Sequence, residues 1–150
     1  MDPPATDPGP PIKRGKLLTS CSACLAGPEK LSHTLVETVN KRDYNNPILS
    51  HISSHLHTKH EYFEAQSKAE FIETHRLITK LHADYDVRVI NSVAEVDEYD
   101  GKAKIWLSLE VTGYPKNVRR EGISLLYWRV SRGEWLHYRS KGLTGGGGGD

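Results

Sequence analysis

The sequence predicts an α+β domain in which helices lie across a curved antiparallel sheet. Residues 86–145 contain four runs rich in Val, Ile, Trp, Tyr and Thr, separated by turns at Asp100-Gly101, at Gly113-Tyr114-Pro115 and at Arg132-Gly133. Such runs with short Gly-containing connections form an antiparallel meander. Residues 31–85 carry apolar side chains mainly at helical spacing. Helices are therefore available to cover one face of the sheet.

The first helix is predicted over residues 31–45 and ends before Pro47. Its apolar positions recur at helical spacing and are Leu31, Leu35, Val36 and Val39. Residues 47–56 can form a second, brief helix.

A strand and a third helix follow. Residues 55–63 show the two-residue alternation of a strand, with His57 on one face and His60 on the other. The third helix is predicted over residues 67–85, because Ser67 and Glu70 have the spacing of a capping box. About three helices thus precede the meander.

Length and composition limit the classes of function. The 150 residues, 37% hydrophobic and 26% charged, suffice for one domain with short tails. A net charge of +1 gives no positive excess for a nucleic-acid backbone. No apolar run is long enough to cross a bilayer. We therefore expect a soluble protein with neither nucleic acid nor a membrane as partner.

Three regions are expected. Residues 1–28 are rich in Pro and Gly and read as a flexible arm, residues 31–145 form the domain, and residues 146–150 are a flexible glycine tail. Cys21 and Cys24 lack the companion ligands of a zinc site and the strand-then-helix setting of a redox pair. Reduced thiols in a cytoplasmic protein are therefore favoured. Secretion, suggested by the basic and then apolar residues 13–27, is the less favoured alternative.

The order of elements and several local segments resemble the nuclear transport factor two-like (NTF2-like) superfamily, in particular its SnoaL-like branch. The matching segments are NKRDYNN at the end of the first helix, SKAEF at the start of the third, AEVDEYDGKAKIW across the first hairpin and WRVSRGEWLHYR across the last. The resemblance covers about residues 31–145. It implies a cone-shaped fold with a ligand pocket at its wide end and dimers formed through the sheet.

The resemblance also implies a function. Members of the branch include polyketide cyclases, isomerases and dehydratases that act on small hydrophobic molecules by acid/base catalysis without a cofactor, some in secondary metabolism. Other members are non-catalytic binding or association domains, which gives the alternative function. The carboxylate of the isomerase branch has no clear counterpart, because the end of the first strand offers His60 and Glu61.

Candidate site residues follow from pairing the last hairpin about Arg132-Gly133. This register places Val130 opposite Trp135, Trp128 opposite His137 and Leu126 opposite Arg139. The resemblance favours this face as the pocket wall, while a one-residue shift would turn Tyr127 and Tyr138 inward instead.

Histidine titrates near neutral pH, which suits it to proton transfer. The predicted catalytic residues are His75, His137 and His57. The predicted substrate-binding residues are Tyr62, Trp128, Arg139, Phe71 and Leu126, of which Arg139 and Tyr62 could stabilise an enolate oxygen. A core role for His75 and His137 is the alternative.

Two further features bear on metal binding and on assembly. A metal site formed by His51, His55, His57 and His60 is not favoured, because no acidic or sulfur ligand accompanies them. Trp106 alternates with the apolar row Ala103, Ile105, Leu107, Leu109 and Val111, so it should lie on the outer sheet surface. An outward Trp supports a homodimer.

Overall fold

The computed structural model describes residues 22–61 and 63–144. Most of the expected arm, with Cys21, lies outside these ranges, as do Tyr62 and the glycine tail. Within them, the first helix extends further toward the N-terminus than expected. It is α1 (Ser22–Asn40), and Gly27 has a non-helical backbone (φ 76°, ψ 166°) where two helical pieces meet.

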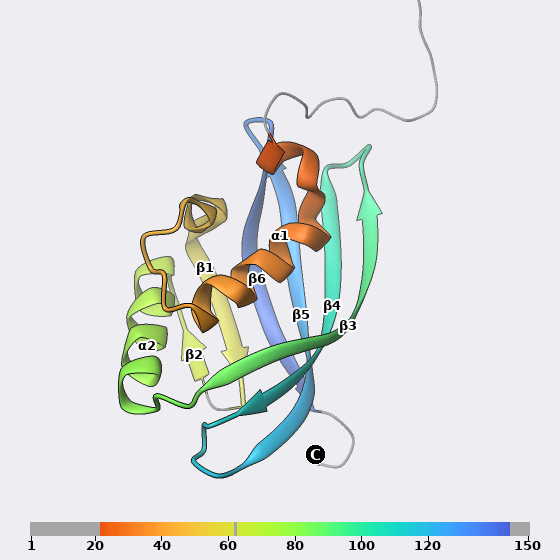
Figure 1. Ribbon diagram of the computed structural model, residues 1–150. Helices are drawn as coiled ribbons and strands as arrows, with labels where there is room; N and C mark the ends of the chain where they lie inside the picture. The colour runs from red at the N-terminus through yellow and green to blue at the C-terminus, as the bar shows by residue number, and fades with distance from the viewer. Residues whose placement is uncertain (1–21, 62, 145–150) are drawn as a thin grey trace, which may run out of the picture.

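A curved six-stranded sheet carries the fold, with two α-helices packed against it (Figure 1). The strands lie in the order β2-β1-β6-β5-β4-β3. Helix α1 crosses the concave face of the sheet, and α2 packs on β1 and β2. The remaining elements are β1 (Ile52–His60), β2 (Phe63–Ala65), α2 (Lys68–Leu81), β3 (Asp86–Asp97), β4 (Lys102–Thr112), β5 (Arg119–Ser131) and β6 (Glu134–Thr144).

The predicted meander is confirmed, because β3 to β6 pair antiparallel in sequence order. All three predicted turns separate these strands. The last is the tightest: Arg132 and Gly133 both have positive φ (55° and 81°), as a two-residue hairpin turn requires. Gly113 is needed for another reason, since a Cβ there would come within 2.3 Å of the Asp84 carbonyl oxygen.

Two expectations about the first half of the domain are wrong. The second of the three expected helices is only a 3₁₀ turn, η2 (Pro47–His51), and Ile52 already begins β1. Two α-helices are therefore described, not about three. The sheet is also mixed and not wholly antiparallel, because β1 pairs parallel with β6. The alternation in β1 could reveal a strand but not the direction of its distant partner.

The predicted capping box at the start of α2 is confirmed. The Glu70 backbone N–H donates to the Ser67 hydroxyl (3.1 Å), and the Glu70 carboxylate accepts from the Gln66 N–H (2.7 Å). The reciprocal bond thus goes to the residue before the N-cap.

The segment after α1 ties the helices to the edge strand β3. The Asn40 amide bonds both backbone groups of Val87, as a neighbouring strand would. The Arg42 guanidinium donates to the carbonyls of Ala83 and Tyr85. The Tyr44 hydroxyl bonds the Thr79 hydroxyl on α2 (2.9 Å). These contacts hold α2 and the start of β3 beside the end of α1.

Trp128 lies at the centre of the core and is fully buried. Its indole Nε1–H donates to the Ser32 hydroxyl (3.0 Å), and that hydroxyl donates to the Pro28 carbonyl in the same helix (2.7 Å). This chain satisfies a buried indole and fixes α1 over β5. Apolar side chains around Trp128, including Leu31, Leu35, Ile105 and Leu126, complete the core.

Replacing Ser32 by Ala should lower the free energy of unfolding by about 1–3 kcal/mol, because the buried Trp128 N–H then loses its acceptor. Thr34→Ala is the matched control, since the Thr34 hydroxyl makes the same bond to the carbonyl four residues back but on the exposed face of α1. Its effect should stay within about 0.5 kcal/mol. Urea unfolding measures both variants, and equal effects would contradict the role given to Ser32.

Candidate functional site

The concave face of the meander is lined by alternate residues of β4 and β5. The apolar row of β4 faces inward as predicted, with Ala103, Ile105 and Leu107 buried. In the register, Ala103 pairs with Trp128 and Ile105 with Leu126. Trp106 faces outward and is half-buried, which confirms its predicted side.

The favoured register of the last hairpin is confirmed over its first half. Val130 pairs with Trp135, and Trp128 with His137. A β-bulge then intervenes, so that Tyr127 pairs with Arg139 and Leu126 with Ser140. The extra residue moves every later side chain of β6 to the opposite face.

The predicted inward position of Arg139 is therefore wrong. Its side chain is exposed on the outer face, and its guanidinium lies 5.3 Å from the centre of the Tyr127 ring. Ser140 takes the inward place and donates to the Thr58 hydroxyl of β1 (2.6 Å).

His137 lies in the interior, next to Trp128. Only 2% of its surface is exposed, and its ring centre is 5.1 Å from that of Trp128. Its Nδ1 is 3.1 Å from the Tyr127 carbonyl oxygen. A carbonyl can only accept, so Nδ1 carries the proton of the neutral ring. Burial lowers the His137 pKa to about 4, because the interior disfavours the charged imidazolium.

His75 reaches the interior from α2. It is 8% exposed, and its ring lies against Phe63 and Phe71, with centres 4.4 and 4.5 Å away. Its Nδ1 is 3.1 Å from the Phe71 carbonyl oxygen, so Nδ1 again carries the proton. Burial lowers its pKa to about 4.

The two rings share an unusual feature at the other nitrogen. Within residues 22–61 and 63–144, the Nε2 of His75 and the Nε2 of His137 have no hydrogen-bond partner. Each is thus a bare lone pair on a ring withdrawn from water. Buried polar atoms without partners are rare in proteins, and each needs an explanation.

His60 is a third imidazole of this interior, and the sequence analysis did not include it among the site residues. It ends β1 on the face of Leu56 and Thr58, and its Nε2 is 3.2 Å from the Ser124 hydroxyl. The ring packs on Gly142, where a Cβ would come within 3.3 Å. Burial, followed by the charge of Arg120, lowers its pKa to about 4. Alternation along β1 correctly separated His60 from His57, but His57 was the one predicted to face the pocket.

These three imidazoles form one cluster, which we call the imidazole cluster: His60, His75 and His137. A charge on His60 would lower the pKa values of both other rings, so His75 and His137 each lie within electrostatic reach of His60. No Asp or Glu of the described residues contributes to the three shifts. The cluster is therefore neutral at pH 7.

The other predicted site residues divide into four groups. His57 is exposed on the opposite face of β1 from His60, so its predicted place in the pocket is wrong. Trp128 and Leu126 are inward but covered by α1, as core residues. Phe71 is half-buried against His75 and stays a candidate. Tyr62 lies outside the described residues.

Beyond His60, toward the start of β5, the interior becomes polar. Arg120 is half-buried and pairs with the inward Val111, and its Nε and Nη2 donate to the Tyr114 carbonyl (2.9 and 2.7 Å). Burial raises the pKa of the neighbouring Tyr85 to about 12, which the charge of Arg120 partly opposes. The sequence analysis missed Arg120, which only its register with β4 reveals.

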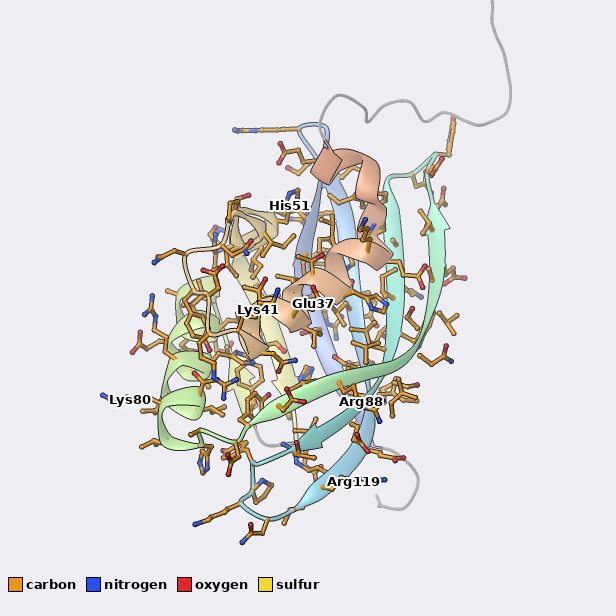
Figure 2. The ribbon with its side chains drawn as sticks, in the orientation of Figure 1. Glu37, Lys41, His51, Lys80, Arg88 and Arg119 are labelled. Carbon is orange, nitrogen blue, oxygen red and sulfur yellow. The ribbon has the colours of Figure 1, made fainter. Side chains whose placement is uncertain are left out.

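A surface hollow of about 450 Å³ lies at the same end of the molecule. It is lined by Leu81, His82, Ala83, Asp84, Thr112, Gly113 and residues 116–119. None of the imidazole cluster lines it. Figure 2 shows Arg119, one of its lining residues, at this end and His51 of η2 at the other.

Within residues 22–61 and 63–144, no group of three or more His, Cys, Asp or Glu side chains is placed to hold a metal ion. No helix in these ranges is long and apolar enough to span a membrane.

Comparisons with known proteins identify the fold. No sequence profile of a protein family and no curated protein matches the chain. A protein of unknown function with a cystatin-like fold from Nostoc punctiforme is similar over 79% of this chain and 88% of its own, with 17% identity and a TM-score of 0.62. An NTF2-like protein from Cytophaga hutchinsonii is similar over 76% and 92%, with 12% identity and a TM-score of 0.58.

A proposed ketosteroid isomerase from Shewanella frigidimarina is similar over 75% of this chain and 91% of its own, with 9% identity and a TM-score of 0.62. The chain therefore has the NTF2-like fold, and the resemblance noted in the sequence is confirmed at the level of the fold. At these identities the likeness concerns the fold.

Acidification should destabilise the domain through the imidazole cluster. The folded pKa values lie below the ordinary 6.5, so the unfolded chain binds protons first as the pH falls, and stability present above pH 6.5 is lost toward pH 4. Each of the three rings should lower the free energy of unfolding by about 2 kcal/mol between about pH 7.5 and about pH 5. Urea unfolding across this range measures the loss.

His75→Phe should reduce that loss by about 2 kcal/mol, because one titrating ring is removed. His57→Phe, on the exposed face of β1, should leave it unchanged. A free energy of unfolding that stays flat from about pH 7.5 to about pH 5 in the unmodified protein would show that the three rings are not buried as neutral imidazoles.

Proposed function

We propose that this protein is a small-molecule enzyme of the cyclase, isomerase or dehydratase kind, resembling the SnoaL-like branch and acting by acid/base catalysis without a cofactor. The observation that carries this proposal is the pair of buried Nε2 atoms of His75 and His137, which have no hydrogen-bond partner among residues 22–61 and 63–144. An unpartnered buried acceptor costs stability. A proton-transfer role would explain why two such rings are kept in the interior.

The strength of the base suits a carbon acid next to a carbonyl. An imidazole with a pKa of about 4 has the basicity of a carboxylate, so it stays unprotonated at neutral pH and ready to accept. The imidazole cluster would then take the place of the carboxylate expected in the isomerase branch. His60, the last residue of β1, lies at the strand end where that carboxylate is expected.

In the proposed reaction, Nε2 of His137 or His75 takes a proton from the carbon beside the carbonyl. The C–H electron pair moves to the carbonyl oxygen, which becomes an enolate. Where a C=C double bond is conjugated with the enolate, the imidazolium returns the proton to the far carbon of that bond, which completes an isomerisation. Where the substrate carries a β-hydroxyl, the enolate re-forms the carbonyl and expels the hydroxyl, which takes the proton from the imidazolium and leaves as water. The Nδ1–H bond to a backbone carbonyl holds each ring in the required tautomer and stabilises the imidazolium formed.

A general-base probe tests this function without knowledge of the substrate. His75→Phe and His137→Phe should each lower kcat/KM for Kemp elimination of 5-nitrobenzisoxazole by about 100-fold or more, the usual size of a general-base contribution. His57→Phe is the matched control and should keep full activity. Wild-type rates in both interior variants would contradict the proposal and favour the alternative, a non-catalytic ligand-binding domain.

The outer face of the sheet supports a second proposal, a homodimer formed through the sheet. Val93, Trp106 and Leu125 lie in one row across β3, β4 and β5, on the face away from the helices. Val93 is 55% exposed and Trp106 half-buried, whereas Leu125 is buried; Ile123, also on β5, is 36% exposed. We call these four residues the outer patch. A contiguous apolar patch of this kind on a sheet face suits a self-complementary contact.

Val93→Glu should convert the dimer to a monomer, because it places a charge in the centre of the proposed contact. Val96→Glu is the matched control. It lies on the same strand and is also exposed, but it pairs with the inward Ala103 and so faces the other way. Analytical ultracentrifugation measures the mass of each. A monomeric wild-type protein, or dissociation by both variants alike, would exclude this interface.

A further inference from the structure

The two halves of the edge strand β3 differ in how their free side is covered. Strand β3 ends the sheet formed by the described residues, and Figure 1 shows its last part at the outer margin, beyond β4. In the first half, the Asn40 side chain bonds both backbone groups of Val87, and a β-bulge at Ile90 interrupts the ladder with β4. A cap and a bulge both hinder other strands from pairing with an edge. The first half of β3 is therefore closed.

The second half of β3, residues 91–97, lacks this protection, and we call it the open edge. It contains neither Pro nor Lys, the residues that usually guard an exposed edge, and its pairing with β4 continues without a further bulge. Residues 93–97 are all exposed, and Val93 and Val96 place apolar side chains on the two opposite faces of the strand. Extended backbone with apolar side chains is thus left at the margin of the sheet.

The pairing register identifies the backbone groups on the free side. Because the N–H and C=O of Val87 both bond Asn40, they point away from β4. In an antiparallel pair every second residue has this orientation, and Val87 pairs with Val111 of β4. Counting in twos along β4 from Val111 gives the residues of the open edge with the same orientation, which are Ser92, Ala94 and Val96. No group of the described residues bonds their backbones on that side, so their donors and acceptors are available to a further strand.

The open edge and the turn that follows it are acidic. Residues 91–101 contain no basic side chain and carry the carboxylates of Glu95, Asp97, Glu98 and Asp100. Lys104 and Lys102 of β4 pair with the first two of these residues and so balance only half of the negative charge. A second copy of this edge would bring the same carboxylates into the contact, where like charges repel. Charge therefore favours a basic partner.

We propose that the open edge of β3 binds an extended basic peptide of another protein, which adds to the sheet as a further strand beside β3. Backbone bonds to Ser92, Ala94 and Val96 hold the peptide, which is the way a strand joins an exposed sheet edge. Its apolar side chains contact Val93 and Val96, and its basic side chains pair with Glu95 and the other carboxylates. This interaction goes beyond the proposed enzyme and does not depend on it.

Two synthetic peptides of opposite charge test the proposal. One peptide of about nine residues alternates lysine and valine, and the other alternates glutamate and valine. Fluorescence anisotropy at low salt should show at least about tenfold tighter binding of the lysine peptide to the unmodified protein. Hydrogen exchange should show that this binding protects the Ala94 and Val96 amides, which a purely electrostatic contact would leave unprotected.

Two variants separate the backbone and charge contributions. Ala94→Pro should weaken binding of the lysine peptide by about tenfold or more, because it removes a donor on the free side and leaves the ladder with β4 intact. Thermal unfolding shows whether this variant is folded. Glu95→Lys keeps every backbone donor and should weaken binding by about fivefold. Glu73→Lys is its matched control and should bind as the unmodified protein does, since Glu73 is exposed on α2, which packs on β1 and β2 at the other margin of the sheet.

Equal affinity for the two peptides, no binding of the lysine peptide up to about 1 mM, or equal losses in the Glu73 and Glu95 variants would overturn the proposal. Protection of the Ala94 amide in the protein without peptide would also overturn it. Protection that increases with protein concentration would identify a second copy at the edge, and protection independent of concentration would identify another part of the same chain.

Discussion

The hydrogen-bonded chain from Trp128 through Ser32 to the Pro28 carbonyl is the contact on which the domain depends. A fully buried indole must find an acceptor. Here the acceptor lies on α1, so the same bond that satisfies the ring also places the helix across the concave sheet. His137 packs against Trp128 and is thereby removed from water. Core packing and the chemistry of the interior thus share one residue.

The bulge in β6 determines which side chains of that strand face the interior. Without it Arg139 would face inward, and its charge would lie beside His137. With it, Ser140 faces inward and the guanidinium of Arg139 stays on the outer face over Tyr127. The charge of Arg120 acts on His60, at the far end of the imidazole cluster from that position.

Local signals were enough to predict the meander, its three turns and the capping box of α2, because each depends on residues close together in the chain. Alternation also gave the correct face for Trp106 and the first half of β6. The parallel pairing of β1 with β6 joins distant segments, and no local pattern encodes it. The bulge at the middle of β6 breaks alternation without a Gly or Pro to mark it, so Arg139 was misplaced. His57 was placed in the pocket through the resemblance, although its own strand turns it outward.

The central claim is that His75 and His137 are buried as neutral rings with a bare Nε2. Long-range ¹H–¹⁵N NMR of the imidazoles measures this directly. We expect both rings to carry a proton on Nδ1 alone at pH 7 and to titrate near pH 4. Rings protonated at Nε2, or titrating at the ordinary value of 6.5, would contradict the claim and with it the proposed catalysis.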